Sequence, residues 1–365
     1  MKKIFVTETF LPEKEELFQF FERFWKDKWI TNRGAYVREL ENKILSYLNL
    51  KSDLFLTTNG TLALQLTFNT LPENKRKIIT TPYTYVATVS AMVWEKFQPV
   101  FADIEPEYLT LDPEKVREIL SKQHEDIAAI VPVHVYGNPA DVNAFDDISK
   151  EYDIPVIYDA AHAFGVKYNG KSLFDYGDIS IASFHATKIF HTIEGGAVFS
   201  KDKALLKRMF QMHNFGHVSD VEFDEVGINA KMNEFQAAMG LSVLPYMDEI
   251  IQNRKLISEW YDEFLNFNGY KRLRIRPGTD WNYSYYPIFF EDVETLKHVI
   301  KKLNENGIFP RRYFFPSLNK LPYLKNNKKM KVSEYISERV ICLPLSHGLN
   351  REEVLDVAMN INQIK

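Results

Sequence analysis

The chain has 365 residues, of which 45% are hydrophobic and 14% aromatic, and its formal net charge is −4. Such a length can bury a large core and is typical of one large and one smaller domain, while the charge gives no reason to expect a nucleic-acid partner. A single cysteine, Cys342, excludes an internal disulfide framework and fits a reducing compartment. The basic start breaks at Thr7-Glu8, which argues against a signal peptide, and no apolar stretch approaches the roughly 20 residues that span a bilayer. We therefore expect a cytoplasmic protein without a membrane partner.

Short apolar runs alternate with helical patterns through the first two-thirds of the chain. The predicted strands are 54–56, 77–80, 99–103, 127–133, 155–158, 179–184 and 197–199, and the helices between them are 61–70, 84–94, 113–122 and 142–152. This alternation predicts an α/β fold with a mostly parallel sheet between layers of helices. Asn169-Gly170 predicts a tight hairpin turn.

The last third of the chain has a different pattern. A helix rich in small residues is predicted at 232–241, and a longer helix at 244–267 leads out of the sheet domain. The strand 285–290, the helix 293–306 and the strand 340–343 then predict a smaller α+β domain. We expect a large domain at 1–245, which includes an N-terminal arm, and a small C-terminal domain at 246–365.

Asp159 and Lys188 are the pair of residues most indicative of chemistry. Asp159 ends the apolar run that starts at Pro155, and Lys188 follows the next strand, 29 positions later, just after Ser183. An acid at a strand end followed by a strand that delivers Ser and Lys is the arrangement of a pyridoxal phosphate enzyme, in which the acid pairs with the pyridinium nitrogen and the lysine forms a Schiff base. Taken singly, Lys188 could be a solvated charge and Asp159 a hydrogen-bonded structural carboxylate.

Other residues could complete a cofactor site. Gly60 and Thr61, which open a helical pattern, could bind the phosphate together with Ser183, although the same segment could be an ordinary helix cap. Tyr85 could stack on the pyridine ring or belong to the core. His162 could contact the ring or its 3-oxygen, or simply pack in its loop. We expect no metal site.

Seven motifs together resemble those of the DegT/DnrJ/EryC1/StrS group of sugar aminotransferases, almost from end to end of the chain. They are Asn59 to Leu64, Thr84 to Thr88, Pro99 to Asp103, Val131 to Gly137, Asp159 to Ala163, the segment around Lys188, and Gly227-Ile228-Asn229. The resemblance implies pyridoxal phosphate, the type I fold of its transferases, and a homodimer with active sites shared across the interface. It also implies that Asn229 reaches the cofactor phosphate of the neighbouring subunit.

The resemblance leaves some functions open. Lys188 argues against the sugar dehydratases of the group, in which histidine replaces the lysine. A regulatory sensor that binds the cofactor is the competing non-enzymatic class. Many members carry arginine at the position of Lys231. Because lysine cannot bind an anion bidentately, a role that depends on the two-pronged arginine side chain does not carry over to Lys231.

Within the group, four segments are most similar to transaminases that make dTDP-4-amino-4,6-dideoxyglucose with L-glutamate as amino donor. They are Thr31 to Gly34, Phe184 to Thr192, Lys231 to Glu234 and Arg311 to Phe314. His185 and His191 flank Lys188 and could contact the sugar, and we expect Tyr313 to bind the substrate as well. Lys231 or Arg311 could meet its diphosphate, for which arginine suits the geometry. Amination at C3, or of a UDP- or GDP-linked sugar, is the alternative, and Arg311 could instead be a solvated loop residue.

Overall fold

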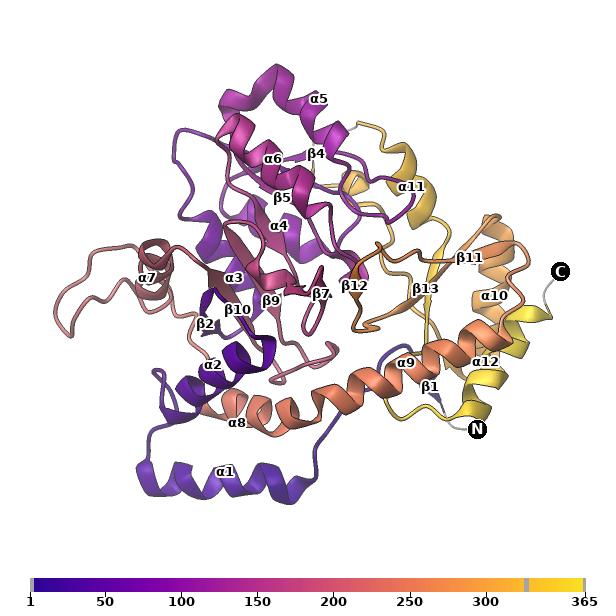
Figure 1. Ribbon diagram of the computed structural model, residues 1–365, viewed down its shortest axis with the longest axis horizontal. Helices are drawn as coiled ribbons and strands as arrows, with labels where there is room; N and C mark the ends of the chain where they lie inside the picture. Colours follow the sequence, from indigo (N-terminus) through magenta and orange to yellow (C-terminus); the bar gives the residue numbers. More distant parts are fainter. Residues whose placement is uncertain (1–2, 325–327, 364–365) are drawn as a thin grey trace.

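The computed structural model describes residues 3–324 and 328–363, so the outer ends of the two expected domains lie outside the described residues. Two groups of strands form the central sheet (Figure 1). The first group runs in the order β2 (Asp53–Thr57), β10 (Gly196–Ser200), β9 (Ile179–Ser183) and β6 (Ile157–Asp159), and the second in the order β4 (Gln98–Phe101), β3 (Lys77–Thr80) and β5 (Ile127–Val131). Parallel bridges from Ile130 to Val156 and from Val133 to Asp159 join the two groups into one sheet.

The central sheet is parallel except for one strand. β10 runs antiparallel to both of its neighbours, β2 and β9, and every other adjacent pair is parallel. The prediction of a mostly parallel α/β fold is therefore confirmed. β5 has five fully buried residues, as expected for a strand with helices on both of its faces.

Helices cover both faces of this sheet (Figure 1). Residues of α3 (Gly60–Phe68), α4 (Val86–Trp94) and α7 (Lys203–Met212) share one core with one face of the strands. On the opposite face lie α5 (Pro113–Gln123), α6 (Val142–Tyr152), α2 (Ala35–Leu48) and α8 (Glu234–Val243), with α1 (Lys14–Asp27) packed outside α8. Asp or Asn side chains cap many of the helix starts and so fix where these helices begin; among them are Asn59, Asp112, Asp141, Asp202 and Asn233.

A second core forms around a small antiparallel sheet. Its strands are β11 (Tyr270–Arg272), β13 (Tyr286–Phe290) and β15 (Val340–Leu343), and α10 (Val293–Glu305) and α12 (Arg351–Asn362) pack with them. α11 (Lys331–Ser337) precedes β15, and β1 (Ile4–Phe5) pairs with β14 (Ile308–Phe309), which brings the start of the chain to this part. No helix in the described ranges combines the length and apolarity needed to cross a membrane.

The long helix α9 (Met247–Phe264) runs from one core to the other (Figure 1). Met247 and Ile250 belong to the core of the large sheet, whereas Ile257 and Tyr261 belong to the second core. The predicted helix 244–267 is shorter than expected, because a separate 3₁₀ turn precedes α9 at Leu244–Tyr246. The division of domains at residue 245 stays a prediction.

Local differences from the predicted elements bear on the site. β6 ends at Asp159 itself, and α4 starts at Val86, so that Tyr85 is its N-cap residue rather than part of the helix. The hairpin at Asn169-Gly170 is confirmed between β7 (Lys167–Tyr168) and β8 (Lys171–Ser172), and both turn residues have positive φ. β12 (Thr279–Asp280) adds to this hairpin.

Candidate active site

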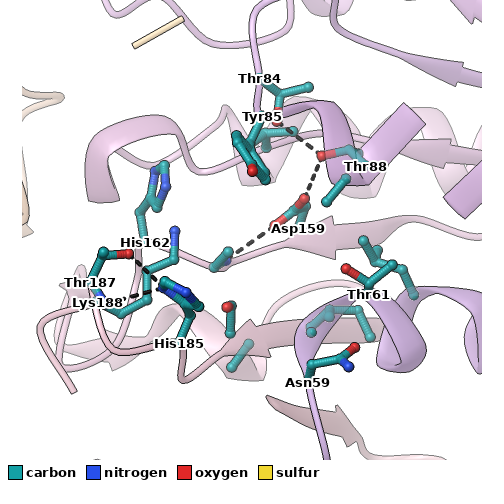
Figure 2. A pocket seen from close by; sticks show the side chains of 18 of the residues that line it. Asn59, Thr61, Thr84, Tyr85, Thr88, Asp159, His162, His185, Thr187 and Lys188 are labelled. Atoms are coloured by element: carbon teal, nitrogen blue, oxygen red, sulfur yellow. Dashed lines mark hydrogen bonds between the residues drawn. The ribbon is translucent and has the colours of Figure 1, made fainter. Parts of the chain in front are cut away.

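A pocket of about 450 Å³ opens where β5, β6 and β9 end and α3 and α4 begin (Figure 2). In a parallel sheet, the crevice beyond the carboxyl ends of the strands is the usual place for a ligand. Ten of the predicted site residues line it: Gly60, Thr61, Tyr85, Asp159, His162, Ser183, His185, Lys188, Arg311 and Tyr313.

Asp159 is a buried carboxylate at the end of β6. It accepts hydrogen bonds from the Thr88 hydroxyl at 2.7 Å and from the backbone N–H of Ala161 at 3.1 Å. Burial raises the pKa of Asp159, while these two hydrogen bonds and the positive charge of Lys188 oppose the rise. An acid at this depth can pair with a positively charged group of a ligand in the pocket, which would relieve the cost of burying its charge.

Lys188 lies in the loop that follows β9. Its backbone N–H donates to the carbonyl oxygen of His185 at 2.8 Å, which forms a turn at the lysine. Burial lowers the pKa of the ε-amino group to about 8, and the charge of Asp159 partly opposes this shift. With that pKa, about one-tenth of the amine is neutral at pH 7, far more than for an ordinary lysine. The residue is therefore suited to act as a nucleophile or a base.

His162 is a neutral donor of hydrogen bonds. Its Nδ1 accepts the backbone N–H of Tyr136 at 3.1 Å, so the proton of the neutral ring is on Nε2. Burial, with a smaller contribution from the charge of Lys188, places the pKa of His162 well below its usual range. The Tyr285 ring packs edge-on at 4.9 Å between centroids, and the Phe314 ring lies parallel at 5.8 Å.

The start of α3 offers donors for an anion. Asn59 Oδ1 accepts the N–H of Leu62 at 2.8 Å, so the segment is indeed a helix cap. The cap does not exclude the phosphate role, because backbone N–H groups at a helix start bind anions. A Cβ on Gly60 would lie only 3.0 Å from Cβ of Ser183, so glycine lets α3 approach β9 closely without displacing its neighbour.

Tyr85 is half exposed and lies on the α4 side of the pocket, across from the loop that carries His185 and Lys188 (Figure 2). The alternative of a core residue is therefore wrong. An exposed ring on a pocket wall is available to stack on a planar ligand.

Three predicted residues do not line this pocket. His191 is buried: its Nε2 donates to the carbonyl oxygen of Phe10 at 2.7 Å, and its Nδ1 accepts the N–H of Ile193 at 3.3 Å. Both ring nitrogens are engaged within the fold, so the expected contact of His191 with a sugar is corrected to a structural role. Lys231 donates to Asn214 Oδ1, and Asn229 forms a bridge with Asn214, both in the loop that follows α7.

Several lining residues were not predicted. Thr88 lies three residues after Tyr85 on the same side of the first turn of α4, a spacing that could have revealed it. Thr187 bonds Nδ1 of His185 at 2.8 Å, and Glu194 Oε1 lies 3.5 Å from His185 Nε2. Tyr285 and Phe314 come from the C-terminal part of the chain. Phe314 ends the segment Arg311 to Phe314 that the resemblance singles out, whereas no sequence signal points to Tyr285.

The residues fit pyridoxal phosphate. Asp159 can hold a protonated pyridine nitrogen, the amine of Lys188 can condense with an aldehyde, and the start of α3 can bind a phosphate. Tyr85 is free to cover the ring. Each of these groups lines the same pocket.

Known proteins resemble the chain over its full length. The DegT/DnrJ/EryC1/StrS aminotransferase family matches residues 12–362. Two relatives called dTDP-4-amino-4,6-dideoxy-D-glucose transaminase are 36% identical over 370 residues (Shigella dysenteriae, 100% of both chains) and 34% identical over 369 residues (Escherichia coli, 98% of this chain and 97% of the other). The crystal structure of DesI in the presence of its TDP-sugar product has a TM-score of 0.92 and 28% identity, and covers 99% of this chain and 93% of that one. The chain therefore belongs to the DegT/DnrJ/EryC1/StrS family of pyridoxal phosphate-dependent aminotransferases.

Proposed function

We propose that the protein transfers the amino group of L-glutamate to C4 of dTDP-4-keto-6-deoxy-D-glucose, giving dTDP-4-amino-4,6-dideoxy-D-glucose. The observation that carries the proposal is that the Lys188 amine lies in one pocket with Asp159. Its pKa of about 8 allows this amine to act both as a base and, once protonated, as an acid near neutral pH. The names of the two relatives that match over nearly the whole chain support the sugar.

The residues of the pocket have separable roles in this reaction. Bound pyridoxal phosphate supplies an aldehyde that carries the amino group and an electron sink for the carbanion. Asp159 holds a positive charge at the pyridine nitrogen. The neutral amine of Lys188 removes the proton from the α-carbon of glutamate, and its ammonium form later delivers a proton to the sugar carbon. His162 Nε2 donates a hydrogen bond into the site.

Three residues of the pocket and Lys231 are proposed to bind the nucleotide sugar or the donor. His185 and Tyr313 offer hydrogen-bonding groups, and the side chain of Arg311 forms no hydrogen bond or ion pair with other described residues, so it is available for a diphosphate or carboxylate. Lys231, whose pKa is lowered by burial, lies outside the pocket of its own chain and is proposed to act on the site of a second subunit.

The dimer is part of the proposal. The loop between α7 and α8 projects from the molecule (Figure 1) and exposes apolar side chains that a monomer would leave in water: Phe215, Val221, Phe223 and Val226. A second copy that covers this loop would bring Asn229 toward the partner's phosphate cradle. We also propose that the protein works in the cytoplasm, which the unpaired Cys342 supports.

A panel of sugars tests the reaction. Protein loaded with pyridoxal phosphate is incubated with L-glutamate and dTDP-, UDP- and GDP-linked 4-keto and 3-keto 6-deoxy sugars, and the products are identified by NMR. We expect 2-oxoglutarate and a product with nitrogen at C4 of the dTDP sugar. Nitrogen at C3, or a preference for UDP or GDP, would overturn the substrate. Absence of 2-oxoglutarate in a single turnover with every sugar would favour the regulatory sensor.

A further inference from the structure

Arg254 of α9 is a buried cation that the described residues provide with no carboxylate partner. Its Nε donates to the carbonyl oxygen of Tyr283 at 2.9 Å, and its Nη2 donates to that of Ser284 at 2.6 Å. Burial lowers the pKa of this guanidinium to about 10, so it is still charged at neutral pH. Burying a charge whose hydrogen-bond partners among the described residues are backbone carbonyls is unfavourable, so its presence calls for a physical reason.

The two carbonyls belong to a segment, residues 281–285, that is held tightly against the pocket wall. Asn282 Nδ2 donates to the carbonyl oxygens of His162 and Phe164 at 2.9 and 2.8 Å. The Ser284 hydroxyl lies 2.8 Å from the same His162 oxygen. Within the segment Tyr283 has a positive φ of 52°, a conformation that costs energy in a tyrosine unless its surroundings hold it.

The segment ends at the pocket itself. Tyr285 lines the cavity, and its ring packs edge-on against His162. Thus a continuous set of contacts runs from Arg254, through the carbonyls of the segment, to the backbone and the ring of His162. His162 in turn lies close enough to Lys188 for the lysine charge to affect its pKa.

We infer that Arg254 is a positioning residue: by fixing the carbonyls of Tyr283 and Ser284, it holds Tyr285 and His162 in place against the cofactor and Lys188. Arg254 does not itself line the pocket. Because no carboxylate within residues 3–324 and 328–363 pairs with Arg254, the hydrogen bonds to the two carbonyls are the interactions that its charge strengthens. This inference rests on the proposed function only for its effect on turnover.

The test compares Arg254→Met and Arg254→Lys with Lys255→Met, a matched control that removes a positive charge from the next, exposed residue of the same helix. The first readout is the pH midpoint at which the absorption band of bound pyridoxal phosphate changes, which needs neither glutamate nor sugar. We expect Arg254→Met to move this midpoint by about half a pH unit or more. A shift of one pH unit corresponds to about 1.36 kcal/mol of altered interaction between the two protonation states. Arg254→Lys should move it less, and Lys255→Met not at all.

A second readout separates positioning from stability. In Arg254→Met we expect kcat to fall about tenfold or more with KM for glutamate nearly unchanged. Ser284→Ala combined with Arg254→Met should be no worse than the more damaging single variant, because both act through one segment. Folded Arg254→Met protein with a normal midpoint and normal kcat would overturn the inference, as would additive losses. If Arg254→Met does not fold, the same measurements are made on Arg254→Lys. If neither variant folds, the inference is also overturned, because Arg254 would then act through the stability of the fold.

Discussion

The hydroxyl group of Thr88 donates a hydrogen bond of 2.7 Å to the carboxylate of Asp159, although the two residues are 71 positions apart in the chain. Thr84 Oγ1, which lies just before α4, is 3.0 Å from the same hydroxyl, so two hydroxyl groups in series lead to the acid (Figure 2). This contact opposes the effect of burial on the pKa of Asp159 and thereby favours the ionised form that the proposed chemistry needs.

Thr88→Val should weaken the site while keeping its shape. Loss of the donor raises the pKa of Asp159 further, so activity should disappear at a higher pH as the solution is acidified. A hydrogen bond to a charged group contributes about 1.5–3 kcal/mol, so we expect the affinity for pyridoxal phosphate to fall roughly 10- to 100-fold. Equilibrium binding of the cofactor and kcat across acidic and neutral pH measure both effects. Thr88→Ser keeps the donor and should behave like the wild type; an unchanged pH profile in Thr88→Val would contradict the argument.

Asp159→Asn should leave the fold intact and reduce kcat by orders of magnitude. An amide cannot hold the positive charge at the pyridine nitrogen, so the electron sink is lost. Asp175→Asn is the matched control, because Asp175 is also buried but accepts hydrogen bonds from Lys51 and Ser52 outside the pocket. Steady-state kinetics measure kcat of both variants, and circular dichroism checks that both are folded. Near-normal turnover in Asp159→Asn would rule out the role.

Much of the sheet, and the pair of Asp159 and Lys188 in the pocket, could be predicted from the sequence for one physical reason. Strands that are buried on both faces are apolar without interruption, as at 127–131, and their carboxyl ends meet at one edge. Asp159 is the last residue of β6 and Lys188 follows the neighbouring parallel strand β9, so their proximity follows from the topology. α1 was not predicted, although Leu17, Phe20, Phe21 and Phe24 have the spacing of one helix face and pack on the same core.

Other parts of the site depend on tertiary contacts that no spacing reveals. His191 is three residues from Lys188 in sequence, yet the loop turns it away to Phe10, 181 positions distant. Tyr285 and Phe314, which follow α9 in the chain, contact the ring of His162. Such contacts arise from packing between elements distant in the chain, so a pattern along the chain cannot show them.

His191→Phe should reduce stability without affecting the sugar. The substitution keeps an aromatic ring but leaves the Phe10 carbonyl without its donor, which costs about 1–3 kcal/mol of unfolding free energy. Since His191 does not line the pocket, KM for the nucleotide sugar should stay near the wild-type value. His185→Ala provides the contrast, because His185 lines the pocket and its loss should raise this KM. Chemical denaturation and kinetics measure the two quantities; a raised KM with unchanged stability in His191→Phe would contradict the structural role.

Lys188 in protein freed of cofactor should react with acylating reagents at unusually low pH. Its pKa of about 8 means that the neutral, reactive fraction rises through half near pH 8, whereas an unperturbed lysine reaches that fraction near pH 10.4. Peptide mass spectrometry after short exposure to acetic anhydride follows acylation of this residue against pH, and Lys188→Arg protein gives the background. A midpoint above about pH 10 would show that burial does not depress the pKa of this amine.

Two inactive variants should restore each other if the active sites are shared. Lys188→Ala lacks the base of its own site, and Asn229→Ala lacks the group proposed to reach the phosphate of the partner's site. In a hybrid dimer, one site combines the intact Lys188 of one chain with the intact Asn229 of the other, while the second site lacks both. Because a two-fold dimer has two equivalent sites, the hybrid should recover about half of the wild-type activity.

The chains are co-expressed with different affinity tags, and the doubly tagged dimer is purified and assayed. Each variant alone must be dimeric and inactive for the result to count. A pure hybrid that is as inactive as its parents would show that each site is built from one chain.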